Sequence, residues 1–196
     1  MKAKIAVKLI LLLSCISLYS FDLPKYWFKA GSEPDAYEMG IDKGAGPNGG
    51  NSATIKSMKN KIKGFGCLMQ NSQPDKYLGK RVRMSAYVKT KDVVDYASLW
   101  FRVDQWGSDI PLAFDNMRDG KIDRSIKGTN DWAKYEIILD VPEKASNLAY
   151  GAFVNGTGQI WFTNIKFEIV DKSVPSTNIR GEKRTLEEPT NLDFEN

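Results

Sequence analysis

The chain has 196 residues with 28 Lys and Arg, 24 Asp and Glu, and no histidine, which gives a formal net charge of +4. The absence of histidine excludes Ser-His-Asp and Cys-His catalysis, imidazole general bases and histidine-ligated zinc or copper. Residues 1–20 carry three lysines and no acidic residue, so the remaining chain has a net charge of only +1. We therefore expect no binding of nucleic acid, because that requires clustered Lys and Arg.

The beginning of the chain, residues 1–20, has the layout of a secretory signal peptide. It begins with three lysines, at positions 2, 4 and 8. The apolar run 9–13 follows, and small residues come after it. The segment is too short to span a bilayer as a helix of the mature protein. Residues 12–15 also resemble the lipobox of bacterial lipoproteins, in which Cys15 would carry the lipid anchor, whereas cleavage after the small residues that follow is the alternative. The expected location is secreted or cell-envelope.

The second cysteine, Cys67, has no partner for a disulfide inside the mature chain if Cys15 belongs to the signal peptide. Its neighbours Phe65, Leu68 and Met69 are apolar. We therefore expect a buried thiol that packs as a small hydrophobic group, with a reactive thiol as the alternative.

Residues 21–171 read as a series of short strands separated by polar turns, without a convincing amphipathic helix. Strands are expected at residues 26–30, 37–42, 52–58, 64–70, 81–90, 96–105, 111–116 and 132–141. The glycine-rich stretch 43–51 is expected to be a loop, residues 74–79 at most one helical turn, and residues 118–130 a charged link. This pattern favours an all-β fold, an antiparallel β-sandwich of the jelly-roll type, over a parallel α/β fold.

The last strands are expected within residues 147–171, where two runs rich in β-branched and aromatic residues flank the polar, glycine-bearing break 155–158. Such a break predicts a hairpin of two antiparallel strands. In the second run, apolar and polar residues alternate from Asn164 to Ile169, as expected for a strand with one buried face.

Four short motifs in this order resemble the jelly-roll carbohydrate-binding modules and galactose-binding-like domains of exported bacterial proteins. They are Pro-x-x-Trp at 24–27, Gly-Lys-Arg-Val-Arg-Met-Ser-Ala-Tyr-Val-Lys at 79–89, Trp-Ala-Lys-Tyr-Glu at 132–136 and Ile-Trp-Phe-Thr-Asn-Ile-Lys-Phe-Glu at 160–168. The resemblance covers residues 23–171. It implies a non-catalytic carbohydrate-binding module; the alternative is a structural or interaction domain that serves a neighbouring catalytic or sensory domain and binds no small ligand.

Modules of this kind often hold a structural calcium ion, and they commonly have Asp before the Asn of the last strand. This chain has Thr163 before Asn164 at that place, which puts such a site in doubt. Calcium is bound by several oxygen ligands, preferably carboxylates. Glu38, Asp42 and Asp171 are the candidates by their position in the sequence.

A candidate ligand site follows from alternation along two expected strands. Trp100, Arg102 and Asp104 share one face of the strand 96–105, and Arg83 and Tyr87 share one face of the strand 81–90. If these strands pair, the five side chains lie on one outward surface, where aromatic and polar groups could bind a sugar. The alternative is that a loop or another module covers Trp100. Trp106, in the turn that follows, could line the rim of the site or cap the end of the sandwich.

Catalysis by paired carboxylates is not expected, so the chain is predicted not to be an enzyme. The candidate pairs, Asp104 with Asp109 or Asp115 and Asp119 with Asp123, would need defined separations for glycoside hydrolysis. Asp119 and Asp123 lie in a charged stretch in which solvated charge is the simpler explanation.

The stretch 172–196 is polar and charged, with a composition typical of a linker. Its last residues, 191–195, resemble the beginning of modules of the same class, so the start of a second, truncated module is one expectation. A covalently linked downstream domain would then be a partner, beside a carbohydrate ligand.

Overall fold

The computed structural model describes residues 21–120 and 122–179. Within these ranges the chain forms nine strands and three short 3₁₀ helices. The strands are β1 (Phe28–Gly31), β2 (Tyr37–Asp42), β3 (Ser52–Ser57), β4 (Phe65–Ser72), β5 (Lys80–Asp104), β6 (Ala113–Asp115), β7 (Ile126–Val141), β8 (Asn147–Asn155) and β9 (Gln159–Val170). The 3₁₀ helices are η1 (Pro34–Ala36), η2 (Pro47–Gly49) and η3 (Asp75–Tyr77).

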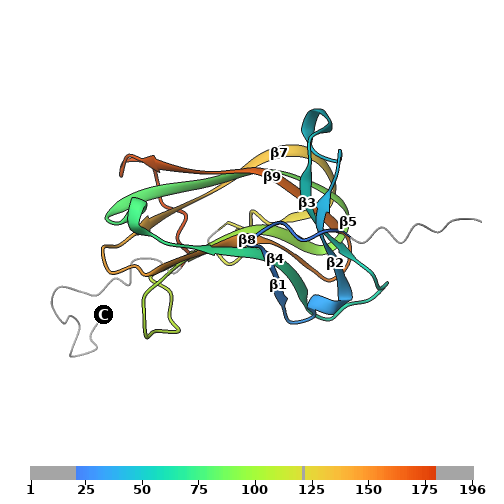
Figure 1. Cartoon of the computed structure of the whole chain (residues 1–196), viewed down its shortest axis with the longest axis horizontal. Coiled ribbons are helices and arrows are strands. Elements are labelled where there is room, and N and C mark those ends of the chain that lie inside the picture. The colour runs from blue at the N-terminus through green and yellow to red at the C-terminus, as the bar shows by residue number, and fades with distance from the viewer. Residues whose placement is uncertain (1–20, 121, 180–196) are drawn as a thin grey trace, which may run out of the picture.

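The strands form two antiparallel layers that face each other, as in a jelly-roll β-sandwich (Figure 1). The first layer has the order β7, β5, β9, β3, β2, and the second has the order β6, β5, β8, β4, β1. In Figure 1, β7 and β9 of the first layer lie above β8, β4 and β1 of the second. The expected all-β sandwich is confirmed.

Strand β5 belongs to both layers. Its first part pairs with β7 and β9 from Lys80 to about Lys91, and its last part pairs with β8 from Tyr96 to Asp104. The turn between the parts includes Asp92 in a left-handed conformation, with φ 52°. Gly158 packs there so closely that a Cβ atom would lie 2.6 Å from the Cα of Val93, which only glycine allows.

The expected hairpin of residues 147–171 is wrong. Both strands form, as β8 and β9, but they do not pair with each other: β8 lies between β4 and β5 in the second layer, and β9 lies between β5 and β3 in the first. The break at 155–158 therefore carries the chain from one layer to the other. It is fixed by the buried hydroxyl of Tyr37, which donates a hydrogen bond of 2.6 Å to the carbonyl of Gly156.

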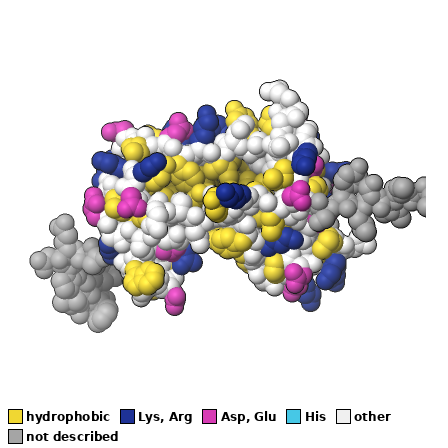
Figure 2. Space-filling model, in the orientation of Figure 1, with side chains coloured by type: hydrophobic (Ala, Val, Ile, Leu, Met, Phe, Trp, Pro, Cys, Tyr) yellow, Lys and Arg dark blue, Asp and Glu magenta, His cyan; other side chains and the backbone are white. Residues whose placement is uncertain are grey.

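The core lies between the layers and follows the alternation of the strands. Val82, Met84 and Val88 in the first part of β5 and Leu99 and Phe101 in its last part are all buried. Figure 2 shows hydrophobic side chains in a band across the middle of the face in view. Partly buried hydrophobic residues pack against this core; they include Trp27, Tyr77, Ile165 and Phe167.

One edge of the sandwich, where β6 and β7 lie, is closed by two connections. Arg124 donates hydrogen bonds to the buried carboxylate of Asp115 on β6 and to the carbonyl of Glu136 on β7. Residues 172–179, which we call the strap, cross the same edge and bind Ile138 of β7 and Phe114 of β6. Both connections hold the short strand β6 against the first layer.

Three predictions concern residues outside the described ranges: the signal peptide at 1–20, the lipobox cysteine Cys15, and the second module at the end of the chain. Among the described residues, no helix has the length and apolar character needed to cross a membrane.

Candidate functional site

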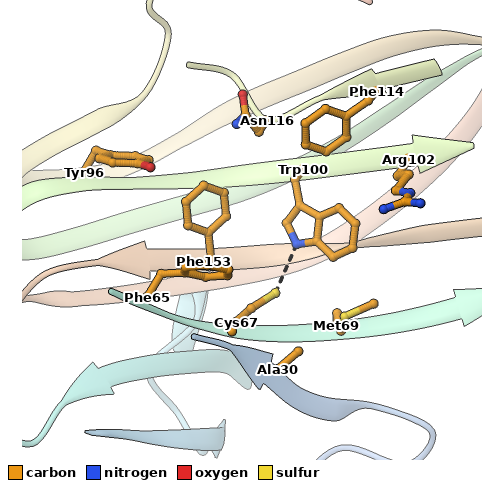
Figure 3. Close-up of a pocket in the computed structure, with 11 residues that line it drawn as sticks. Ala30, Phe65, Cys67, Met69, Tyr96, Trp100, Arg102, Phe114, Asn116 and Phe153 are labelled. Atoms are coloured by element: carbon orange, nitrogen blue, oxygen red, sulfur yellow. Dashed lines mark hydrogen bonds between the residues drawn. The ribbon is translucent and has the colours of Figure 1, made fainter. Parts of the chain in front are cut away.

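The candidate site is a hollow of about 360 Å³ on the outer face of the second layer (Figure 3). Its walls come from each strand of that layer, because outward side chains of neighbouring strands meet in rows. The lining residues are Ala30, Gly31, Phe65, Cys67, Met69, Tyr96, Trp100, Arg102, Phe114, Asn116 and Phe153. Its volume falls in the range of small-molecule sites.

Trp100 forms the centre of the hollow (Figure 3). Its neighbour across the strand pair is Gly151, which has no side chain, and the indole reaches over β8 to β4. There the indole N–H donates a hydrogen bond to Cys67 Sγ at 3.2 Å. This contact fixes the orientation of the indole ring, so Trp100 offers a preformed flat surface.

Aromatic rings extend this surface at one end of the hollow. Phe153 packs edge-on against Phe65 and Tyr96, with ring centroids 5.7 and 5.6 Å apart. The guanidinium of Arg118 lies over the ring of Tyr96, 3.9 Å from its centroid. These contacts hold the rings in place, so this end of the hollow is aromatic and apolar.

The opposite end of the hollow is polar, because Arg102 lies there (Figure 3). Its Nε donates to Asp104 Oδ1 at 2.5 Å and its Nη2 donates to the carbonyl of Asp109 at 3.1 Å. Asp104 in turn accepts a hydrogen bond from Asn147. Arg102 is therefore held in place by its Nε and Nη2 groups, and its remaining N–H groups make no hydrogen bond within the described part of the chain.

Cys67 is buried in the wall between these ends, as expected for a small hydrophobic group. Desolvation by burial raises the pKa of its thiol from 9.0 to about 12, and the hydrogen bond from Trp100 offsets this only in part. The thiol is therefore protonated at neutral pH and is a poor nucleophile.

We expect Cys67 to resist thiol reagents in the folded protein. In a Cys15→Ser variant at pH 8, reaction with Ellman's reagent should be about 1,000-fold slower in buffer than in urea, because a pKa near 12 lowers the thiolate population by that factor. The same shift makes stability fall as the pH rises from 9 towards 12, because the unfolded thiol ionises first. Equal reaction rates in buffer and urea would contradict this assignment.

The structure brings together Trp100, Arg102 and Asp104 of the predicted ligand site, but not the others. Arg83 and Tyr87 lie in the first part of β5, on the outer face of the first layer, so the assumed pairing of residues 81–90 with 96–105 is wrong. Arg83 makes an ion pair with Glu136 there. Trp106 is 93% exposed in the loop after β5 and does not line the hollow.

The three calcium candidates do not form a cluster. Glu38 and Asp42 lie on β2, and Asp42 accepts a hydrogen bond from the indole of Trp161 at 2.7 Å. Asp171 follows β9 and accepts one from the backbone N–H of Ser173. Among the described residues, no group of three or more acidic or cysteine side chains is arranged to hold a metal ion.

Most of the carboxylates considered for catalysis have structural partners. Asp104 is bound to Arg102 and Asn147, and Asp115 is fully buried and paired with Arg124. Asp123 lies in the loop before β7, where hydrogen bonds from the hydroxyl and backbone N–H of Ser125 lower its pKa.

Sequence reasoning missed the wall residues from other strands, above all Cys67, Phe114 and Phe153. Alternation on the expected strand 64–70 would have placed Phe65, Cys67 and Met69 on one face, which is the signal that was available. Their meeting with Trp100 depends on the register of β4, β8 and β5, which is set by pairings distant in sequence.

Comparison with known proteins found no matching family model. The chain is 45% identical over 172 residues to the Uncharacterized HTH-type transcriptional regulator YbfP of Bacillus subtilis (strain 168). The match covers 87% of this chain and 57% of that protein. The chain thus spans little more than half the length of the curated relative it matches.

Solved structures show the same fold at low sequence identity. The CBM22-1 xylan-binding domain of Paenibacillus barcinonensis Xyn10C superimposes with a TM-score of 0.51 at 13% identity, over 78% of this chain and 90% of that one. The Stig cyclase Fisc from Fischerella sp. TAU, in complex with an indole compound, superimposes with a TM-score of 0.51 at 15% identity, over 82% and 93%. The jelly-roll fold is shared with carbohydrate-binding modules, as the sequence resemblance implied.

The predicted function is corrected by these comparisons. The relative with 45% identity is named a transcriptional regulator, and the fold is shared by a cyclase as well as by a xylan-binding domain. The prediction that the chain functions as a carbohydrate-binding module is therefore wrong. A shared jelly-roll fold does not carry the function with it.

Proposed function

We propose that the β-sandwich is the ligand-responsive domain of a protein related to transcriptional regulators, and that it binds a flat, largely apolar small molecule in the hollow around Trp100. The hollow carries this proposal: a fixed indole surface, a rim of aromatic rings and one anchored guanidinium. A suitable ligand would have an aromatic body that packs on the indole of Trp100 and a carboxylate or other acceptor group that accepts hydrogen bonds from Arg102.

The similarity to an HTH-type regulator supports this division of roles. A helix-turn-helix unit needs two helices, and the described part of the chain contains only 3₁₀ helices of three residues. In our proposal, DNA recognition belongs to another part of such a protein, and the sandwich provides the response to a small molecule. The indole compound bound to the Fischerella cyclase is consistent with an aromatic ligand on this fold.

We also propose that the hollow binds without catalysing a reaction. The chemistry of its walls supports this, since burial raises the pKa of the Cys67 thiol to about 12. Asp104, which is bonded to the lining residue Arg102, also accepts a hydrogen bond from Asn147. Export of the chain is a separate proposal, which rests on residues 1–20 alone.

The test is calorimetric titration of the purified full chain with naphthoate, its uncharged analogue naphthamide, and xylohexaose. We expect saturable binding of naphthoate, weaker binding of naphthamide, and none of the sugar. Trp100→Ala should weaken naphthoate binding at least about tenfold because it removes the central surface. Tyr87→Ala, which removes an exposed aromatic ring from the other layer, is the matched control and should bind as the wild type does. Saturable binding of the sugar alone would contradict the proposed ligand class.

A further inference from the structure

The hollow and the strap meet at one residue, Phe114 of β6. Its side chain lines the hollow next to Trp100 and Arg102 (Figure 3). Both backbone groups of Phe114 bind the strap. The N–H of Phe114 donates to Asn178 Oδ1 at 3.1 Å, and the N–H of Ile179 donates to the carbonyl of Phe114 at 2.9 Å. A displacement of Phe114 would therefore disturb these two hydrogen bonds to the strap.

Strand β6 has few backbone pairings, because it is only three residues long. It pairs with β5 through the residues Phe101 to Val103, and the strap occupies its other edge. The next residues along the chain also connect the hollow to this edge: Asn116 lines the hollow, and Asp115 points inward to Arg124.

The other end of the strap is anchored independently of β6. The backbone N–H of Thr177 donates to the carbonyl of Ile138 on β7 at 2.8 Å, and the hydroxyl of Thr177 accepts from the N–H of Ile138 at 2.9 Å. Arg81 donates to the carbonyls of Lys172 and Val174. The strap thus has a firm attachment to the first layer and a second attachment that depends on the wall of the hollow.

We propose that the strap is the output element of the hollow: a ligand against Phe114 and docking of residues 178–179 on β6 stabilise each other. This inference rests on the proposed function, since it names how that site is regulated. The coupling is reciprocal. Ligand binding stabilises the docked strap by a certain factor, and loss of the docked strap weakens ligand binding by the same factor. Ligand binding would in this way change how firmly residues 178–179 are held on β6.

The first test needs no ligand and measures amide hydrogen exchange of the full chain by nuclear magnetic resonance. Phe114→Ala is expected to speed the exchange of the Ile179 amide about fivefold or more, and to change that of Thr177 less. Phe28→Ala is the matched control, because Phe28 lies partly exposed on β1 at the opposite edge of the same layer, and should leave Ile179 unchanged. Wild-type exchange of Ile179 in Phe114→Ala would overturn the proposed coupling.

The second test adds naphthoate. It should slow exchange of the Ile179 amide about fivefold or more in the wild type and not in Trp100→Ala, and Asn178→Ala should weaken naphthoate binding by a similar factor although Asn178 lies outside the hollow. Binding that leaves Ile179 unchanged would overturn the coupling and leave the proposed function standing. A wild-type chain that binds no naphthoate would contradict the proposed ligand class, and the Phe114→Ala measurement would still decide the coupling.

Discussion

Replacement of Arg124 by Met should lower the free energy of unfolding by about 3 kcal/mol, as expected when one partner of a buried ion pair is removed. The carboxylate of Asp115 is fully buried, and Arg124, whose side chain is 34% exposed, is its charged partner. Without the guanidinium, a buried negative charge would lack compensation. Arg124 also binds the carbonyl of Glu136, so β6 would lose one of its connections to β7. Urea unfolding at neutral pH measures the change.

The double variant Asp115→Asn/Arg124→Met separates the charge from the packing. It removes both charges, and we expect it to lose less stability than Arg124→Met alone, because no unpaired carboxylate remains in the interior. The backbone N–H of Met117, which donates to Asp115 at 2.7 Å, still has an oxygen acceptor in the asparagine. A double variant less stable than the single one would contradict the assigned role of the pair.

The second large effect is expected at Phe101, where replacement by Ala should cost about 3–5 kcal/mol of stability. The side chain has no exposed surface and packs edge-on against Phe167, with ring centroids 5.4 Å apart. Its removal leaves a cavity between the two layers that the neighbouring strands cannot fill. Thermal and urea unfolding measure the loss.

Trp100→Ala is the matched comparison, because Trp100 is the adjacent residue of the same strand and points to the other face. We expect a loss of about 1–2 kcal/mol of stability, since the indole is only partly buried on the outer face. Naphthoate binding should be weakened at least about tenfold in Trp100→Ala and retained in folded Phe101→Ala. The reverse order of stability losses would show that the faces of β5 are wrongly assigned.

Much of the secondary structure could be predicted because alternation and turn residues are local. The strand at 37–42 was predicted with its observed bounds, and the buried face of each part of β5 was predicted correctly. What alternation does not contain is the layer to which a strand belongs. Residues 81–104 were therefore divided into two strands that pair, whereas they form one strand that turns at Asp92 from one layer into the other.

The same limit explains the candidate site. Trp100, Arg102 and Asp104 were grouped correctly because they are alternate residues of one strand, whereas Tyr87 and Arg83 were added on an assumed pairing. The wall residues Cys67 and Phe153 enter the site through strand registers that link segments far apart in sequence. The function was misjudged for another reason: the motifs that resembled carbohydrate-binding modules are structural, and they specify the fold rather than the ligand.

The most direct test of the central claim, that the hollow binds a flat apolar ligand, is the indole N–H resonance of Trp100. The chain has five tryptophans, so the indole region of a nuclear magnetic resonance spectrum can be assigned by single replacements. The indole N–H of Trp100 donates a hydrogen bond to Cys67 in the hollow, and that of Trp161 donates one to Asp42 outside it. Saturating naphthoate is predicted to shift the Trp100 signal and leave that of Trp161 in place. An unchanged Trp100 signal, at concentrations that saturate binding, would contradict the claim.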